Sequence, residues 1–276
     1  MTNIPHRQKE LNLGVEYGGD AILSDDFLKN FPHAAVDTYD FPKPEELKKE
    51  DYFSQLAKSL KKAEELIHRT LKPDEIQVAV GGDNSISFPS LRAVLDRVDA
   101  SRLGYIRVDS HPDMNNISTS PTGNFHGMWM RPFVGSFEEK KIARLIDKKL
   151  TPYQLMFIGN LDINPGEQEF FTGKAHVFSG GYIRQNKESV LMNVEQFMNN
   201  YQHIYLGIDI DGFDKSIAPA TGIPAQQGLF PDDIAPVVEY VKESLLCVDL
   251  VEVNPKKEGA AQTIKLAQTL LLSVLK

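Results

Sequence analysis

Residues 108–113 are Val-Asp-Ser-His-Pro-Asp, and residues 207–214 are Gly-Ile-Asp-Ile-Asp-Gly-Phe-Asp. Each of these acidic segments directly follows an apolar run that is typical of a buried strand. Because successive side chains of a strand point to opposite faces, Asp109, His111 and Asp113 can share one face. The first two aspartates of the second segment share a face for the same reason. If the two strands are neighbours, four carboxylates and an imidazole meet at one place, and such crowded charge requires a compensating cation.

Apolar runs alternate with helical patterns along the rest of the chain. The expected strands are residues 11–15, 35–39, 76–80, 104–108, 154–158, 175–178, 203–208 and 247–253. The expected helices are residues 21–30, 44–70, 88–98, 137–148, 187–199, 231–244 and 260–276. Strict alternation of strands and helices predicts one parallel sheet covered by helices on both faces. We therefore expect a single α/β domain over residues 1–276.

Two long loops follow the acidic strand ends directly, at residues 112–125 and 212–228. Loops of this length inside a compact domain are usually functional or disordered. In open α/β sheets, ligands bind beyond the carboxyl ends of the strands. The position of the acidic clusters and their chemistry therefore indicate the same functional edge.

The composition excludes several classes of protein. The formal net charge of −8 argues against nucleic acid as a partner, because phosphate binding needs a basic surface. The single cysteine, Cys247, lies in an apolar run and is expected to be a buried core residue in a reducing compartment. No apolar stretch approaches the roughly 20 residues of a membrane span, and residues 1–6 show no signal-peptide core. We expect a cytoplasmic protein.

The candidate ligands are mainly carboxylates with one imidazole. Oxygen-rich sites suit Mg²⁺ or Mn²⁺ better than structural Zn²⁺, and the imidazole favours Mn²⁺. Five protein ligands suit two ions about 3.5–4 Å apart that share a bridging hydroxide. The alternative is that these aspartates only cap helices and turns, which would be the preferred interpretation of an isolated Asp-x-Asp pair.

Further short motifs surround this cluster in a fixed order. They are Gly-Gly-Asp-Asn-Ser at 81–85, Asp-Ser-His-Pro-Asp at 109–113, Thr-Gly-Asn-Phe-His-Gly at 122–127, Asp-Ile-Asp-Gly-Phe-Asp at 209–214, Ala-Pro-Ala-Thr-Gly at 218–222 and Glu-Val-Asn-Pro at 252–255. The set resembles the ureohydrolase family of arginases, agmatinases and formimidoylglutamases. The resemblance runs from about residue 14 to the C-terminus and is greatest to arginases.

The resemblance implies a three-layer α/β/α fold with a central, mostly parallel sheet of about eight strands. It also implies a small-molecule substrate whose guanidino or amidino carbon–nitrogen bond is hydrolysed by a hydroxide that bridges two Mn²⁺ ions. Members of the family are commonly homo-oligomers.

The resemblance assigns metal-binding roles by position. Asp109 and Asp209 would bridge the two ions. Asp113 would serve the first ion, whereas His111 and Asp211 would serve the second. In catalysis, Asp113 or the bridging carboxylates would orient the attacking hydroxide.

Catalytic and substrate-binding roles follow in the same way. His126 matches a loop histidine that handles protons, and Glu252 matches the carboxylate that pairs with the substrate guanidinium. Asn115, Thr122 and Asn124 match positions that hold the polar end of an amino-acid substrate.

Three positions depart from the family pattern. Asn84 stands where a histidine usually binds the first ion, and its neutral amide predicts weak or absent binding there. Asn164 stands where an aspartate faces the α-amino group of the substrate, which weakens the case for L-arginine. Gly207 replaces a common serine, and the sequence offers no physical reason for that change.

Other functions remain open at this stage. One is an agmatinase- or formimidoylglutamase-type hydrolase, although an acidic substrate needs positive charge and the nearby loops offer little beyond Arg131. Another is a metal-poor, catalytically weak homologue with a binding or regulatory role, which Asn84 and Asn164 would explain.

Overall fold

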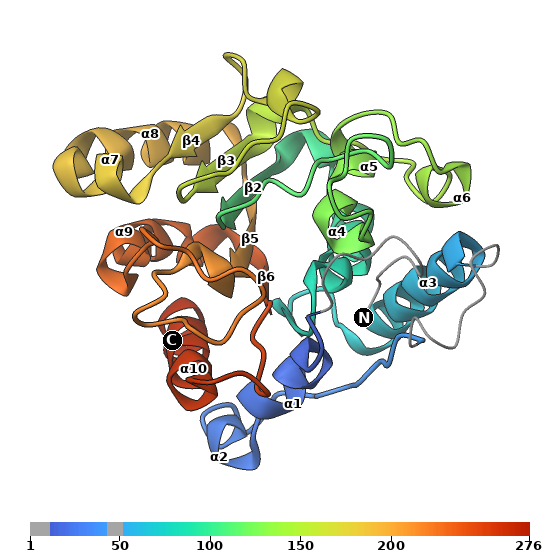
Figure 1. The fold of residues 1–276 in the computed structure, drawn as a ribbon, viewed down its shortest axis with the longest axis horizontal. Helices are drawn as coiled ribbons and strands as arrows, with labels where there is room; N and C mark the ends of the chain where they lie inside the picture. The colour runs from blue at the N-terminus through green and yellow to red at the C-terminus, as the bar shows by residue number, and fades with distance from the viewer. Residues whose placement is uncertain (1–11, 43–51) are drawn as a thin grey trace.

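Six parallel strands form the centre of the computed structural model, which describes residues 12–42 and 52–276 (Figure 1). In chain order they are β1 (Gln77–Val80), β2 (Leu103–Val108), β3 (Leu155–Ile158), β4 (His176–Phe178), β5 (His203–Asp209) and β6 (Leu245–Val251). Their order across the sheet is β1-β6-β5-β2-β3-β4. The strands β2 and β5, which precede the two acidic segments, are therefore direct neighbours.

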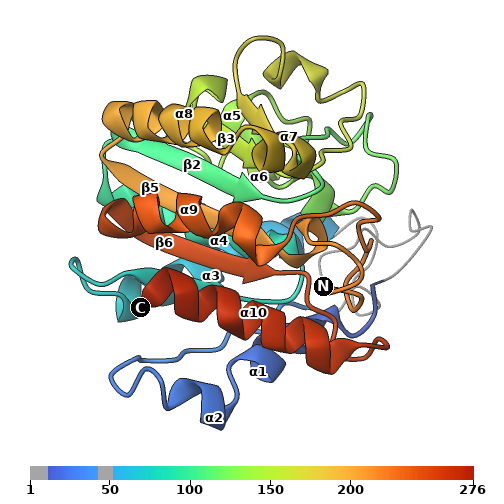
Figure 2. The ribbon, with the colours of Figure 1, turned by 90° about the vertical axis from the view of Figure 1, so that its left-hand side faces the viewer.

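Helices cover both faces of the sheet, as expected (Figures 1 and 2). One face is covered by α8 (Lys187–Asn200), α9 (Pro231–Val241) and α10 (Ala260–Leu275). The other face is covered by α3 (Tyr52–Thr70) and α4 (Ser87–Arg97). The shorter α-helices are α1 (Gly18–Ile22), α2 (Asp25–Leu28), α5 (Arg131–Val134), α6 (Lys140–Ala143) and α7 (Gly180–Gln185). The 3₁₀ turns are η1 (Val15–Tyr17), η4 (Asn84–Ile86), η5 (Ala100–Arg102), η6 (Phe125–Met128), η7 (Pro152–Gln154), η8 (Gln168–Phe170), η9 (Ile210–Gly212) and η10 (Lys242–Ser244).

The side chains of β2 show how the two faces differ. Ile106 and Val108 pack into an aliphatic core beneath α8, α9 and α10. Tyr105 packs into a more aromatic core beneath α3 and α4. Because the side chains of a strand alternate, Arg107 and then Asp109 follow Tyr105 on this second face. The acidic site is therefore built on the aromatic side of the sheet.

The predicted α/β architecture with a parallel sheet is confirmed, but the described residues contain six strands rather than about eight. Residues 35–39 form no strand, because no described strand pairs with them, and Val36 is half exposed. The described part of the expected strand 11–15 turns into η1 instead. The first part of the expected helix 44–70, residues 44–51, lies outside the described residues.

Two expected helices differ from the prediction. The expected helix 21–30 is divided between α1 and α2, because the Ser24 hydroxyl accepts a hydrogen bond from the Phe27 amide and starts a new helix. The expected helix 137–148 is reduced to α6. None of the helices in the described part of the chain is both long and apolar enough to span a bilayer.

Candidate metal and catalytic site

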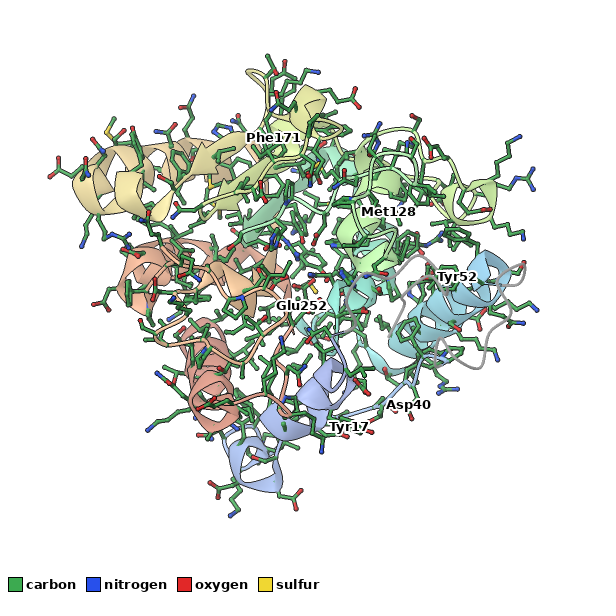
Figure 3. The ribbon with its side chains drawn as sticks, viewed as in Figure 1. Tyr17, Asp40, Tyr52, Met128, Phe171 and Glu252 are labelled. Atoms are coloured by element: carbon green, nitrogen blue, oxygen red, sulfur yellow. The ribbon has the colours of Figure 1, made fainter. Side chains whose placement is uncertain are left out.

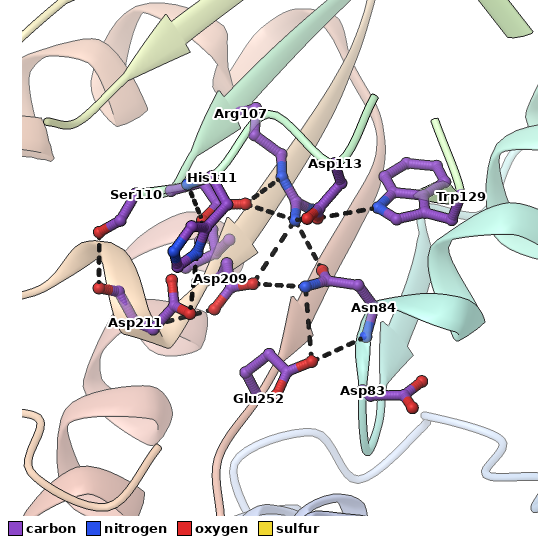
Figure 4. A network of polar contacts seen from close by, with 12 residues as sticks. Asp83, Asn84, Arg107, Ser110, His111, Asp113, Trp129, Asp209, Asp211 and Glu252 are labelled. Atoms are coloured by element: carbon purple, nitrogen blue, oxygen red, sulfur yellow. Dashed lines mark hydrogen bonds and ion pairs between the residues drawn. The ribbon is translucent and has the colours of Figure 1, made fainter. Parts of the chain in front are cut away.

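The acidic residues predicted from the two segments meet at the carboxyl ends of β2 and β5 (Figure 4). Their ligand atoms form two groups, and within each group the atoms lie within 4.8 Å of one another. The first group is Asp109, Asp113 and Asp209, and the second is Asp109, His111 and Asp211. The Asp109 carboxylate therefore belongs to both.

Backbone geometry holds these acids in place. The Asp109 carboxylate accepts a hydrogen bond from the His111 amide at 2.8 Å, and Asp209 accepts one from the Asp211 amide at 2.9 Å. Asp113 and Glu252 have φ angles of 55° and 68°, and they are the two non-glycine residues with positive φ in the described part of the chain. Such strain persists where the surroundings enforce it, and it gathers at functional sites. Glu252 lies near the centre of the molecule at the end of β6 (Figure 3).

The second group, which we call the His111 half, has the features of a metal site. His111 Nδ1 lies 3.2 Å from Asp211 Oδ2 and 3.8 Å from Asp109 Oδ1. Burial lowers the pKa of His111, but the charge of Asp211 and its hydrogen bond outweigh burial and raise the pKa to about 11. Asp211 Oδ1 is buried and accepts no hydrogen bond from the described residues. An imidazole, two carboxylates and an unsatisfied oxygen fit a divalent cation.

The first group, which we call the Arg107 half, already contains a cation. Arg107 Nη2 lies 2.5 Å from Asp109 Oδ2, 2.7 Å from Asp113 Oδ2 and 3.5 Å from Asp209 Oδ2. The same nitrogen donates a hydrogen bond to Asn84 Oδ1 at 2.6 Å. Figure 4 shows this guanidinium at the centre of the contacts. Arg107 was not among the residues predicted from the sequence, where its only signal is a lone charge in an apolar strand beside an acidic motif.

The charges of this half depend on one another. Burial raises the pKa of Asp109, and Arg107 opposes this effect. Burial also raises the pKa of Asp113 and of Asp209. Burial lowers the pKa of Arg107, but Asp109 and its neighbours outweigh burial and hold the value well above normal. The guanidinium therefore remains charged and is the positive partner of three buried carboxylates.

Asn84 serves this cluster through both ends of its amide. Its Oδ1 accepts from Arg107, and its Nδ2 donates to Asp209 Oδ2 at 2.5 Å. Its backbone amide donates to Glu252 Oε1 at 3.2 Å. The other oxygen of Glu252 accepts from Asn12 Nδ2 at 3.0 Å. Asn84 is therefore occupied by protein partners and positions both acids.

His126 lies on η6, beside Asp83. Its Nδ1 is 3.6 Å from Asp83 Oδ2. Burial lowers the pKa of His126, but Asp83 and then Glu252 outweigh it and raise the pKa to about 9. Burial raises the pKa of Glu252 to about 7, although His126 opposes the rise. A protonated imidazole and a readily ionised carboxylate thus interact near neutral pH.

The predicted substrate-binding residues fall into two environments. Asn115 and Asn124 are buried, and the Oδ1 atom of each accepts no hydrogen bond from the described residues. Thr122 Oγ1 accepts a hydrogen bond from the Asn124 amide at 3.2 Å. Asn164 instead donates from Nδ2 to the buried carboxylate of Glu167 at 3.2 Å, so it stabilises its own loop. The side-chain amide oxygens of Asn115 and Asn124 are therefore free to accept a hydrogen bond from a ligand, in contrast to the Asn164 side chain, which is bound to Glu167.

The structure gives a reason for the glycine at position 207. Gly207 pairs in register with Arg107 across β5 and β2. A Cβ atom at this position would meet Tyr105 Oη at 2.6 Å and Asp249 Oδ1 at 3.1 Å. The Tyr105 ring also contacts the Tyr205 ring, with 4.9 Å between centroids. The glycine therefore makes room for a tyrosine beside the arginine.

The chain is similar to known proteins of one family. The model of the Arginase family matches residues 5–276. The arginase of Entamoeba histolytica is 31% identical over 190 residues, which are 67% of this chain and 64% of that protein. The arginase of Bacillus subtilis is 26% identical over 274 residues, which are 95% of this chain and 92% of that protein.

Solved structures show the same fold. The crystal structure of the Entamoeba histolytica arginase in complex with L-ornithine has a TM-score of 0.84 and 25% identity, with 97% of this chain and 93% of that chain covered. The proclavaminate amidino hydrolase of Streptomyces clavuligerus has a TM-score of 0.65 and 21% identity, with 95% of this chain and 84% of that chain covered, which is a likeness of fold.

Proposed function

The chain belongs to the arginase family, and we propose that it hydrolyses the carbon–nitrogen bond of a small guanidino or amidino compound. The observation that carries this proposal is the His111 half of the acidic cluster, with its unsatisfied buried carboxylate oxygen. Glu252 and His126 lie close enough to the acidic cluster to interact with its charges, and they supply an anionic and a protonated group. General acid–base hydrolysis requires one positioned group that is protonated and another that is deprotonated.

We propose that the cofactor is Mn²⁺ and that Asp109, His111 and Asp211 hold it. Two carboxylates with one imidazole suit this ion better than the sulfur-rich ligand sets of structural zinc. When bound by these residues, such a cation would lower the pKa of water and so would supply a nucleophile near neutral pH. The protein contributes a fixed frame, because the Asp109 carboxylate accepts from the His111 amide, and the backbone of Asp211 donates to Asp209 and accepts from Ser110.

Glu252 is the proposed anchor of the substrate cation. A planar guanidinium is bound best by a carboxylate that accepts two parallel N–H bonds. Both oxygens of Glu252 already accept from N–H groups, of Asn84 and Asn12, so the carboxylate faces donors. Its pKa of about 7 means that an approaching cation favours ionisation. The strained φ of 68° holds the side chain in this direction.

His126 is the proposed proton donor to the leaving amine. With a pKa of about 9, its imidazole is protonated near neutral pH, which is the form a donor needs. Its side chain is 27% exposed, so it can be reprotonated from solvent after each turnover. Asp83 orients the ring from the buried side.

The polar end of the substrate is assigned to Asn115, Thr122 and Asn124. The unpartnered amide oxygens of Asn115 and Asn124 can accept hydrogen bonds from a ligand. Asn164 lacks the charge of an aspartate and is bound to Glu167, so it gives little attraction for an α-ammonium group. We therefore propose a guanidino substrate without restricting it to L-arginine. Agmatine-like and formimino compounds are the alternatives.

A second candidate function is favoured by the Arg107 contacts. If the Arg107 guanidinium weakens catalysis, the chain would bind a guanidino compound and serve a regulatory role.

One experiment separates the two candidate functions. Mn²⁺-loaded protein is incubated with L-arginine, agmatine, guanidinobutyrate and formiminoglutamate, and release of urea or ammonia or formamide is measured alongside direct binding. Turnover of any of them supports the hydrolase. Binding without turnover supports the second candidate. The absence of both binding and turnover would refute both candidate functions.

A further inference from the structure

We propose that the guanidinium of Arg107 is a built-in replacement for one metal ion, so that the acidic cluster binds one divalent cation from solution instead of two. This differs from the expectation of two ions drawn from the sequence. The inference rests on the proposed function only for the cation in the His111 half. It concerns how many ions bind and is independent of whether the protein turns over a substrate.

Geometry places the guanidinium where an ion would lie. Asp109, Asp113 and Asp209 could surround a cation, since their ligand atoms lie within 4.8 Å of one another. A single nitrogen, Arg107 Nη2, already lies 2.5–3.5 Å from all three carboxylates. A metal ion needs oxygen ligands at about 2.0–2.2 Å and therefore the same space. The nitrogen and a metal ion exclude each other.

Charge makes the replacement permanent. A guanidinium is not deprotonated at any pH that proteins tolerate, so its charge cannot be titrated away. The Arg107 side chain is 1% exposed, and the three carboxylates that it contacts are buried. Withdrawing one partner of a buried ion pair leaves an uncompensated charge. A metal ion in this position would have to displace Arg107 and leave a buried guanidinium without its carboxylates.

The surroundings of Arg107 are fitted to a guanidinium. The Trp129 ring lies 5.5 Å from Arg107 Cζ, and its Nε1 donates a hydrogen bond to Asp113 Oδ2 at 3.2 Å. The side-chain amide of Asn84 accepts a hydrogen bond from Arg107 and donates one to Asp209. An imidazole that binds a metal through one nitrogen has only an N–H group left and could not accept from Arg107. Gly207, in register with Arg107, leaves room for the adjacent tyrosine.

The His111 half keeps its capacity for an ion. Asp109 turns Oδ2 to Arg107 and Oδ1 toward His111, so one carboxylate bridges the internal cation and the open position. Asp211 Oδ1 is the buried oxygen that no described residue satisfies. His111 is 25% exposed, which leaves this half accessible from solvent. The two halves therefore predict one internal and one external cation.

The test is a count of bound Mn²⁺ by metal analysis after removal of free ion, together with electron paramagnetic resonance of the same samples. The wild-type chain is expected to bind one ion and to show the spectrum of isolated Mn²⁺. An Arg107→Met/Asn84→His double variant removes the internal cation and adds a ligand. It is expected to bind two ions and to show an exchange-coupled spectrum. An Arg107→Lys variant keeps the charge and is the matched control, with one ion expected.

Either of two stoichiometries in the wild-type chain, zero ions or two tightly bound ions, would overturn the proposal. A folded double variant that still binds one ion would also overturn it, because Arg107 would not be what excludes the second. If the double variant does not fold, the wild-type count and spectrum decide alone. Failure of the proposed function is recognised separately, as one bound ion with no turnover of any substrate.

Discussion

The two halves of the acidic cluster share Asp109 and differ in the cation that answers their charge. In the Arg107 half the cation is a buried side chain from β2 that forms ion pairs with three carboxylates. In the His111 half the imidazole is accessible to solvent, and Asp211 Oδ1 accepts no hydrogen bond from the described residues. Two groups that share one aspartate thus differ in character, because a side chain closes the Arg107 half, whereas the His111 half keeps an oxygen that no described residue satisfies. The residue two positions before the shared aspartate makes the difference.

The largest expected effect comes from damaging the His111 half. His111→Ala removes the imidazole ligand, so Mn²⁺ binding should weaken severely and turnover should fall by about 10³-fold or more. Steady-state rates and a metal count measure both effects, with circular dichroism as the check on folding. The matched control is His203→Ala, at a partly exposed position outside the site, where activity should remain. Near-normal activity of His111→Ala would remove this half from the mechanism.

Damage to the Arg107 half should instead appear as lost stability. Arg107→Met leaves three buried carboxylates without their cation, and we expect the free energy of unfolding to fall by about 3–5 kcal/mol. Urea unfolding in the presence of a chelator measures this loss. Lys29→Met is the control, because the exposed Lys29–Asp26 pair should contribute less than about 1 kcal/mol. Equal effects of the two substitutions would contradict the structural role of Arg107.

The pH dependence of metal binding should distinguish the halves further. His111 has a pKa of about 11 in the metal-free chain, so it is protonated at neutral pH and must lose that proton to bind a cation. Mn²⁺ affinity should therefore rise by about tenfold per pH unit between about pH 6 and 9. Titration calorimetry in buffers of different ionisation enthalpy counts the released proton. Affinity that does not change with pH would show that His111 is not a ligand.

The smallest expected effect belongs to His126. Its folded-state pKa of about 9 lies above the ordinary unfolded value of about 6.5, so the Asp83–His126 pair stabilises the fold fully at low pH. That contribution should disappear as the pH rises through about 9. Because His126 is partly exposed, we expect a loss of only about 1 kcal/mol. Comparing the unfolding free energies of wild type and His126→Gln at pH 6 and pH 10 isolates it, and a constant difference would contradict the assignment.

Much of the site could be predicted because it depends on local sequence pattern. Asp109, His111 and Asp113 lie on one short segment after a strand, and period-two alternation alone places them together. The parallel sheet then brings Asp209 and Asp211 to the same edge. The family resemblance added His126 and Glu252, which have no local pattern of their own.

The lone charge of Arg107 in an apolar strand marks it as unusual, but its role could not be predicted in the same way, because that role depends on contacts between distant residues. An arginine inside a strand pattern does not reveal its partner, and the partner here includes Asn84 from another element. The space for Tyr105 that Gly207 provides is likewise visible only in three dimensions. The missing strand at residues 35–39 has a similar cause, since propensity favoured a strand but no neighbouring strand pairs with it among the described residues.

The most direct measurement of the central claim is anomalous diffraction at the manganese absorption edge from wild-type crystals equilibrated with Mn²⁺. We predict one anomalous peak, among Asp109, His111 and Asp211, with the Arg107 guanidinium still between Asp109, Asp113 and Asp209. Two peaks, with the Arg107 side chain displaced from the carboxylates, would contradict the account.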